Sequence, residues 1–318
     1  MSQRVVIAGA SGFLGEAIAR DYADRGWQVT SIGRRGAVSW GDRPALAAAV
    51  DGADTVINLA GRSVNCRYTA RNRAEILASR VDTTQQLNEA IRAAAAPPRV
   101  WLNASTATIY RDARDQPQTE STGEIGSRFS ERVASAWEAS LFDGDLPRTR
   151  RIALRLSIVL GSGGGALPPI VRLARFGLGG PQHHGWWFPS AARRAAGTDL
   201  PPGAPGGGQM VSWIHLDDVV AAVRFLDARD DIAGPVNITA PHPVDNRTLM
   251  HKVRYHVGRP IGLPAYRFML EPAMAVLRTE PELVLKSRWV LPERLTDAGF
   301  SFTHFDLDEA LASILNRA

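Results

Sequence analysis

Apolar positions along this chain fall into two alternating kinds of segment. Short apolar runs typical of buried strands lie at residues 5–8, 27–32, 55–61, 99–106, 151–160 and 234–239. Between them, helical spacing of apolar residues extends over 13–26, 44–50, 69–96 and 129–142, and a further short strand is expected at 38–40. Strands that alternate with helices at this spacing predict an α/β fold, a doubly wound parallel sheet with right-handed crossovers.

The pattern changes after Gly161. Residues 161–209 carry glycine runs, Pro168-Pro169 and Pro201-Pro202, and such a long irregular segment is typical of a lid, a binding loop or disorder. Regular patterning resumes at residue 211, with a helix expected to end at Ala228. We therefore predict a dinucleotide-binding domain of residues 1–165 and 211–240, an insertion or lid of 166–210, and a small, mostly helical C-terminal substrate subdomain of 241–318.

The first strand leads directly into three glycines. Gly9 permits a tight turn, Gly12 permits close approach of the backbone to a pyrophosphate, and Gly15 permits the following helix to pack against the strand. The start of that helix offers unpaired N–H groups to phosphate. A glycine-rich loop that merely joins a strand to a helix is the alternative. The strand–turn–helix context favours a Rossmann-type dinucleotide site.

The second strand ends at Gly33-Arg34-Arg35. An NAD-specific protein places an acidic residue there to bind the ribose hydroxyls. Two guanidinium groups suit a 2′-phosphate instead, and each charge-assisted hydrogen bond contributes roughly 1.5–3 kcal/mol. The pair therefore predicts NADP(H), with two ordinary surface arginines as the alternative.

Composition restricts the remaining classes. The chain has 318 residues, 45% hydrophobic and 22% charged, as an ordinary globular protein has. Cys66 is the only cysteine, so no intrachain disulfide forms, and with no signal peptide or membrane-length run we expect a cytoplasmic protein without a membrane partner. The formal charge of +5 comes from scattered basic residues with acidic neighbours, which argues against nucleic acid.

Several motifs together resemble the extended short-chain dehydrogenase/reductases. They are Gly-Ala-Ser-Gly-Phe-Leu-Gly (9–15), Val-Ile-Asn-Leu-Ala-Gly (56–61), Ala-Ser-Thr-Ala-Thr-Ile-Tyr (104–110), Leu-Arg-Leu-Ser-Ile-Val-Leu-Gly (154–161) and Gly-Pro-Val-Asn-Ile-Thr-Ala-Pro (234–241). More narrowly, Trp137-Glu138, residues 212–217 and residues 292–302 resemble an atypical branch of epimerase-family, or cell-division-inhibitor-like, proteins. The last stretch lies in that branch's C-terminal domain of unknown function.

The chain departs from this family at the catalytic pair. In the family, a Tyr and a Lys four residues later handle the proton. Counting back from Glu138, these two positions are Ser130 and Ala134. The only lysines are Lys252 and Lys286, and the residues four positions before them are Thr248 and Glu282, so the chain contains no Tyr-x-x-x-Lys. The family's helix Asn corresponds to Arg80.

The resemblance still implies a cofactor site and a hydroxyl for the substrate carbonyl. Ser105 or Thr106 is expected to bind that carbonyl. The expected cofactor-binding residues are Gly9, Ser11, Gly12, Phe13, Leu14, Gly15, Arg34, Arg35, Leu59, Ala60, Gly61, Arg80, Ser157, Ile158 and Val159. Arg80 would replace the missing Lys at the ribose, and no metal site is expected.

The source of the proton is open at this stage. A substitute side chain could be Tyr110, which we also expect to contact substrate, or Tyr68, or one of the histidines His183, His184 and His215. Solvent is a second source. A third is the substrate itself, because a ketone with a neighbouring phenol stabilises its own oxyanion.

Such a substrate would be flat and aromatic. Trp186, Trp187 and Phe188 in the insertion, with Phe176, would supply stacking surface for it and exclude water, or else anchor the loop. Ketoreductases of angucyclinone-type aromatic polyketide pathways are similar to this atypical group, so antibiotic biosynthesis is one expected setting.

The sequence therefore predicts an NADPH-dependent ketoreductase for a small-molecule ketone, monomeric or homodimeric. The alternatives are a sugar-nucleotide epimerase or dehydratase, and a non-catalytic NADP(H)-binding regulatory protein.

Overall fold

The computed structural model describes residues 3–185 and 187–316. Its centre is a six-stranded parallel sheet in the order β10-β5-β4-β3-β1-β2. The strands are β1 (Arg4–Ala8), β2 (Gln28–Ile32), β3 (Thr55–Asn58), β4 (Val100–Thr106), β5 (Arg150–Leu156) and β10 (Gly234–Ile238). The chain first moves from β1 to β2 and then crosses to β3 on the other side of β1. This reversal opens a crevice at the carboxyl ends of β1 and β3, and the predicted Rossmann-type α/β fold is confirmed.

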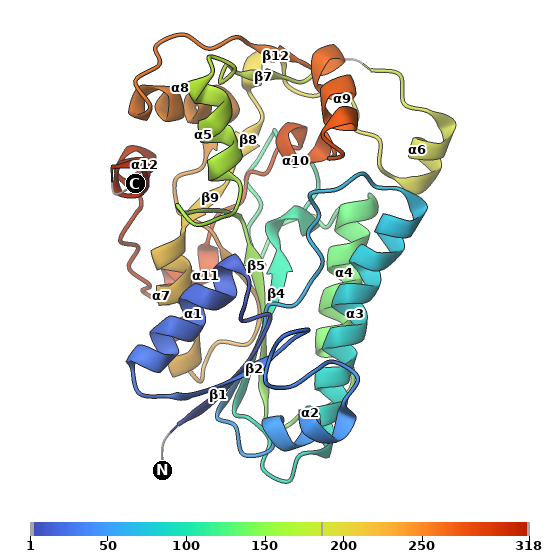
Figure 1. Cartoon of the computed structure of the whole chain (residues 1–318), viewed down its shortest axis with the longest axis vertical. Helices are drawn as coiled ribbons and strands as arrows, with labels where there is room; N and C mark the ends of the chain where they lie inside the picture. The colour runs from blue at the N-terminus through green and yellow to red at the C-terminus, as the bar shows by residue number, and fades with distance from the viewer. Residues whose placement is uncertain (1–2, 186, 317–318) are drawn as a thin grey trace.

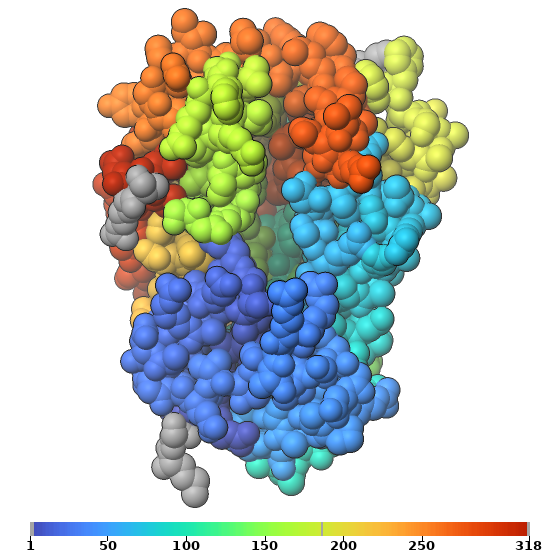
Figure 2. Space-filling model, viewed as in Figure 1, coloured from blue at the N-terminus to red at the C-terminus, as the bar shows by residue number. Residues whose placement is uncertain are grey.

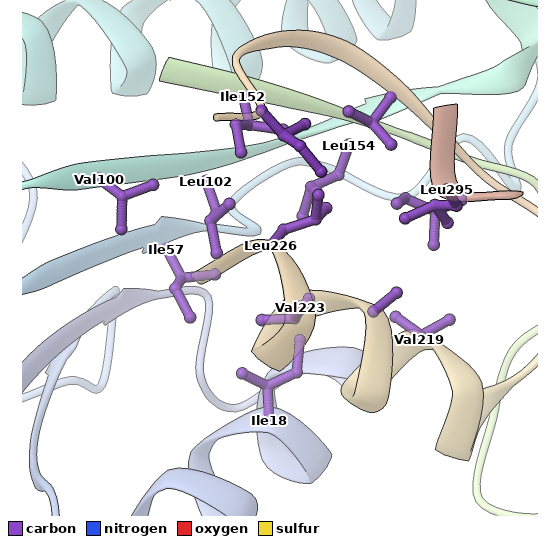
Figure 3. Packing of buried hydrophobic residues seen from close by; sticks show 14 of the residues in the cluster. Ile18, Ile57, Val100, Leu102, Ile152, Leu154, Val219, Val223, Leu226 and Leu295 are labelled. Atoms are coloured by element: carbon purple, nitrogen blue, oxygen red, sulfur yellow. The ribbon is translucent and has the colours of Figure 1, made fainter. Parts of the chain in front are cut away.

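Helices cover both faces of the sheet (Figure 1). α1 (Phe13–Asp24) and α7 (Leu216–Ala228) lie on one face, and α2 (Arg43–Val50), α3 (Ala70–Ala93) and α4 (Phe129–Phe142) lie on the other. Figure 3 shows the first of the two cores, where Ile18 and Val223 from the helices face Ile57 and Leu102 from the strands. All four side chains are buried. Burial of each of these side chains contributes about 1.5–3 kcal/mol. The packing of helices on the sheet therefore holds the carboxyl ends of the strands in place.

Two predicted strands differ from the observed ones. The run 151–160 forms two strands, because the N–H of Ser157 donates to the carbonyl of Ile238 (3.1 Å) and the chain bends there. After the bend, β6 (Ile158–Leu160) pairs with β9 (Trp213–His215) in a separate small sheet. The strand expected at 38–40 forms only an isolated bridge between Val38 and Ile32.

The segment 161–209 contains regular structure that the sequence analysis missed. It includes α5 (Leu167–Arg175), β7 (Gln182–His183), α6 (Ala191–Ala196) and the short η2 (Pro205–Gly207). The pair Pro168-Pro169 opens α5, because the first turn of a helix leaves its N–H groups unbonded and tolerates proline. Leu167 and Val171 then pack in one core with Leu249. This proline pair starts a helix rather than marking a loop.

The C-terminal part is mostly helical. Its helices are α8 (Asn246–His256), α9 (Arg267–Val276), α10 (Glu282–Leu285), α11 (Glu293–Asp297) and α12 (Leu307–Leu315), and it also contains the short strands β11 (Val244–Asp245) and β12 (Ala265–Tyr266). The remaining short elements, η1 (Ala107–Ile109) and β8 (Met210–Val211), lie earlier in the chain. The N–H of Arg288 donates to the carbonyl of Met210, and the N–H of Gln118 donates to that of Trp289, both at 2.7 Å. These hydrogen bonds connect residues 286–291 of the C-terminal part to the domain that contains the central sheet. Among the described helices, none has both the length and the apolar character needed to cross a bilayer.

Candidate functional site

A cavity of about 340 Å³ lies at the carboxyl ends of the central strands. Its walls come from the glycine turn after β1, from the ends of β3, β4 and β5, from α3 and α4, and from the C-terminal residues Leu283 and Arg288. Figure 2 shows this face hollowed near its centre, between α5 in lime, the cyan segment that leads into α3 and the blue N-terminal part. The position matches the crevice where ligands bind in open α/β sheets.

The glycine turn forms a cradle that side chains would fill. Gly9 has φ of +80°, and a Cβ there would lie 2.9 Å from the carbonyl carbon of Leu59. A Cβ on Gly15 would lie 2.2 Å from the carbonyl oxygen of Gly9. Gly12 begins α1 without a side-chain cap, which leaves N–H groups of the first turn open to an anion. Ser11 is exposed beside the turn, and Phe13 and Leu14 line the cavity.

Arg34 and Arg35 are exposed on the loop that follows β2. This loop is held next to the glycine turn, because the N–H of Gly9 donates to the carbonyl of Ile32 (3.0 Å). Within residues 3–185 and 187–316, neither guanidinium forms an ion pair with a carboxylate. Both are therefore available to an external anion beside the turn.

Arg80 reaches the cavity from α3. It donates to the carbonyls of Arg62 (3.1 Å) and Ile76 (3.0 Å), and its guanidinium lies over the ring of Trp137, 5.0 Å from the centroid. Burial lowers the pKa of Arg80 to about 10, because no carboxylate of the described chain compensates its charge. Gly61 makes room for this side chain, since a Cβ there would lie 3.3 Å from its Cζ. An anionic or hydroxyl-bearing ligand would be a suitable partner.

The remaining predicted cofactor residues surround this region. Leu59 lines the cavity, and Ala60 is buried next to it, with its N–H bonded to the side chain of Asn58 (3.1 Å). Ser157 lies at the bend after β5, and its buried hydroxyl has no hydrogen-bond partner in the described chain. Ile158 and Val159 follow in β6. The glycine cradle, the open helix start and the unpartnered hydroxyl all fit a bound dinucleotide.

Ser105 and Thr106, at the end of β4, both line the cavity but differ in their hydrogen bonds. Ser105 donates its hydroxyl proton to Glu138 (2.6 Å), which is also paired with Arg155 (2.8 Å). Thr106 accepts from the N–H of Thr108 (3.1 Å), and its own hydroxyl proton has no acceptor in the part of the chain that the structure describes. Thr106 is therefore the better donor to a carbonyl.

The structure places Tyr110 away from the cavity. Its ring is buried, and its hydroxyl donates to Asn237 (2.9 Å) and accepts from Arg155 (2.8 Å). This network fills the positions that a substrate would need. Our expectation that Tyr110 contacts substrate therefore has no support in its contacts.

The aromatic residues of the insertion also lie off the cavity wall. Trp187 is half-buried, and Phe188 and Phe176 are 74% and 77% exposed, yet none of the three lines the cavity. Trp186 falls outside the described residues. The aromatic walls come instead from other elements, namely Phe13, Tyr68, Phe129 and Trp137.

The three histidines that we considered as acids have other contacts. The ring of His183 packs against that of Tyr266. His184 is buried and accepts from the N–H of Gly203 (3.1 Å), and burial together with Arg267 lowers its pKa to about 4. His215 accepts from the N–H of Asp217 (3.0 Å) and so caps α7. None of them lines the cavity.

The cavity also contains residues that the sequence analysis did not assign to it. Ser130 and Ala134, at the positions of the family's Tyr and Lys, line the wall, as do Thr108 and Arg288. Arg288 donates to the hydroxyl of Thr108 (3.0 Å) across 180 residues of sequence. No local motif signals this contact, because only the folded chain brings the two segments together.

Two family models match parts of this chain. Residues 5–137 match the NAD dependent epimerase/dehydratase family, and residues 267–314 match a domain of unknown function (DUF1731). The chain therefore combines an epimerase-family segment with that C-terminal domain, which confirms the resemblance to this branch of the short-chain dehydrogenase/reductases.

Individual relatives extend over nearly the whole chain. It is 27% identical over 321 residues to the Epimerase family protein YfhF of Bacillus subtilis (strain 168), covering 98% of this chain and 97% of that protein. It is 26% identical over 319 residues to the human Epimerase family protein SDR39U1, covering 98% and 99%.

The crystal structure of human SDR39U1 (isoform 2) with NADPH superposes with a TM-score of 0.84 at 26% identity, covering 99% of this chain and all of that one. A UDP-N-acetylglucosamine 4-epimerase from Bacillus cereus, at 15% identity and a TM-score of 0.70, covers 99% and 96% and shares the fold alone.

Proposed function

We propose that this chain is an NADPH-dependent reductase of a ketone on a small molecule. The observation that carries the proposal is the cavity itself. It joins a glycine cradle and Arg80, which has no carboxylate partner among the described residues, to the hydroxyl of Thr106, whose proton has no acceptor there. The similar human protein has been solved with NADPH, which supports the choice of cofactor.

The cofactor would be held by backbone and arginine groups. Gly9, Gly12 and Gly15 let its pyrophosphate approach the start of α1, and Arg34 with Arg35 would bind the 2′-phosphate. Arg80 would take the ribose side, where the family has lysine. When bound, NADPH supplies a hydride to an acceptor carbon.

The substrate would occupy the part of the cavity nearest α4. Phe129 and Trp137 give that wall an aromatic surface on which a flat ring stacks, and Ile76 and Leu156 exclude water from it. Thr106 would donate to the carbonyl oxygen and orient it. We propose a phenolic aromatic ketone, whose internal hydrogen bond to the carbonyl assists its own reduction. The polyketide pathway itself stays a prediction, since the names of the relatives do not refer to one.

The other two functions have less support. Oxidation of a sugar hydroxyl, the first step of epimerisation, needs a general base, and the residues at the family's catalytic positions are Ser130 and Ala134. A purely NADP(H)-binding protein is consistent with the cradle, but leaves the aromatic wall and Thr106 without a role.

Consumption of NADPH tests the proposal. The purified protein is mixed with NADPH and with phenolic polycyclic ketones or simple aliphatic ones, and absorbance is followed together with product mass. Faster turnover of the phenolic ketones is expected. Thr106→Val should lower kcat/KM by about 10-fold or more, the contribution of one well-placed hydrogen bond, while leaving NADPH affinity unchanged. Tight NADPH binding without turnover of any ketone would favour the binding protein.

A further inference from the structure

We propose that Tyr68 is the proton donor of this cavity, and that Ser130 and Glu282 are residues that position it. The proposal rests on the reductase function above and names the side chain that replaces the family's catalytic tyrosine. It comes from a different element, the loop that precedes α3.

Tyr68 is fixed on three sides at the cavity wall. Its N–H donates to Glu280 (2.7 Å), its carbonyl accepts from Arg73 (2.7 Å), and its ring meets that of Phe129 edge-on at 4.9 Å. The residue is 6% exposed and lines the same cavity as Thr106. A side chain held in this way is already oriented before substrate enters, as a general acid must be.

The hydroxyl of Tyr68 is part of a short polar chain. It shares a hydrogen bond with Ser130, and Ser130 donates to Oε2 of Glu282 (2.7 Å). The other oxygen of Glu282 is buried and has no partner in the described chain. Ser130 occupies the position of the family's Tyr, so the phenol of Tyr68 is hydrogen-bonded to the residue at that position.

The surroundings of Tyr68 favour the protonated form of its phenol. Burial, and then the charge of Glu282, raise the pKa of Tyr68 above its usual value, although Ser130 and Arg288 oppose them. The phenol is therefore protonated at neutral pH. After it gives up its proton, Arg288 and Arg80 would stabilise the anion. Arg288 opposes the rise in the pKa of Tyr68, and the charge of Tyr68 partly offsets the lowering of the Arg80 pKa by burial.

The step balances without another reactant. A hydride adds to the carbonyl carbon, and the electron pair of the C=O π bond moves to oxygen. That oxygen takes the proton from the phenol of Tyr68, so the O–H bond of the tyrosine breaks and that of the alcohol forms. The tyrosinate regains a proton from water once product leaves. Ketone, NADPH and one proton give alcohol and NADP⁺.

Tyr68→Phe tests this assignment, because it removes the hydroxyl and keeps the ring that packs on Phe129. The matched control is Tyr255→Phe, since Tyr255 is 73% exposed and does not line the cavity. Two ketones are compared, acetophenone and 2′-hydroxyacetophenone, the second of which carries its own neighbouring phenol. We expect Tyr68→Phe to lower kcat for acetophenone by about 100-fold or more, and for 2′-hydroxyacetophenone by much less.

A binding measurement gives a readout that does not depend on turnover. Benzamide has the carbonyl of acetophenone but accepts no hydride, and its affinity for the NADP⁺ complex is measured by calorimetry. Loss of one hydrogen bond should weaken benzamide binding about 10-fold in Tyr68→Phe and not in Tyr255→Phe. Equal affinity of wild type and Tyr68→Phe for benzamide would overturn the assignment, as would a lack of binding to the wild type.

Ser130 and Glu282 act through Tyr68, so their variants should change kcat more than KM. Ser130→Ala is expected to lower kcat and Ser130→Thr, which keeps the hydroxyl, to restore it. If wild type is active and Tyr68→Phe keeps kcat within about threefold on acetophenone, Tyr68 is not the donor and the reductase function stands. If wild type reduces no ketone, the reductase function falls and this assignment falls with it.

Discussion

The double change Arg34→Ala with Arg35→Ala removes the proposed 2′-phosphate site and little else. Both side chains are exposed on the loop after β2, and within the described chain neither is paired with a carboxylate. No contact that holds the fold is lost. We therefore expect the free energy of unfolding to change by less than about 0.5 kcal/mol.

The effect on cofactor affinity follows from the hydrogen bonds that a phosphate would receive. One charge-assisted bond contributes about 1.5–3 kcal/mol, which corresponds to about 10- to 150-fold in Kd. Because the site is open to solvent, we count one such bond rather than the sum of two. The Kd for NADPH should rise by that factor, and the Kd for NADH by less than about twofold.

Calorimetric titration of each variant with NADPH and NADH measures both values. The control is Arg20→Ala with Arg259→Ala, which removes the same charge from two other exposed positions. The loss of NADPH affinity should also shrink at high salt, because exposed charges are screened. If the two cofactors lose affinity equally, the assignment to the 2′-phosphate is refuted.

Three further changes probe the turn, the packing below the cavity and the insertion. Gly15→Ala should abolish NADPH binding in calorimetry, because its Cβ would meet a backbone oxygen at 2.2 Å, whereas Gly185→Ala, which meets nothing within 4 Å, should bind normally. Lys286→Met strands the buried carboxylate of Glu131, which it contacts at 2.6 Å, and urea unfolding should show a loss of about 3–5 kcal/mol. The folded-state pKa of His184 is lowered to about 4 from 6.5, so the unfolded chain binds more protons between these values, and stability should fall as pH drops through that window. In His184→Asn, the melting temperature measured by thermal melts should no longer show this fall between about pH 6.5 and 4. If the melting temperature of His184→Asn falls with pH as steeply as that of the wild type, the prediction is contradicted.

The glycine turn and the alternation of strands with helices were predictable because their causes are local. Gly9 and Gly15 are required by contacts within a few residues or with the adjacent strand, and the apolar runs report burial directly. The bend at Ser157 was missed, since residues 151–160 have a continuous strand-type pattern and the break coincides with a hydrogen bond to Ile238.

The cavity was only half predictable for the same reason. The motifs predict Thr106 and Arg80, but they do not show whether the Thr106 hydroxyl proton is available. Its availability depends on Glu138 accepting a hydrogen bond from Ser105 rather than from Thr106. Tyr110 lies only four residues after Thr106 in the motif and yet turns into a buried network. Tyr68 carries no motif at all, and only the tertiary contacts with Ser130 and Phe129 bring it to the wall.

Residues 286–291 also link the C-terminal part of the chain to the cavity of the N-terminal part. They hydrogen-bond to Met210 and Gln118, and Arg288 forms part of the cavity wall. The dinucleotide cradle and the chemistry at the far wall are therefore encoded about 270 residues apart but are assembled as one enclosure. Substitutions within residues 286–291 are therefore expected to change substrate specificity without changing the affinity for the nucleotide.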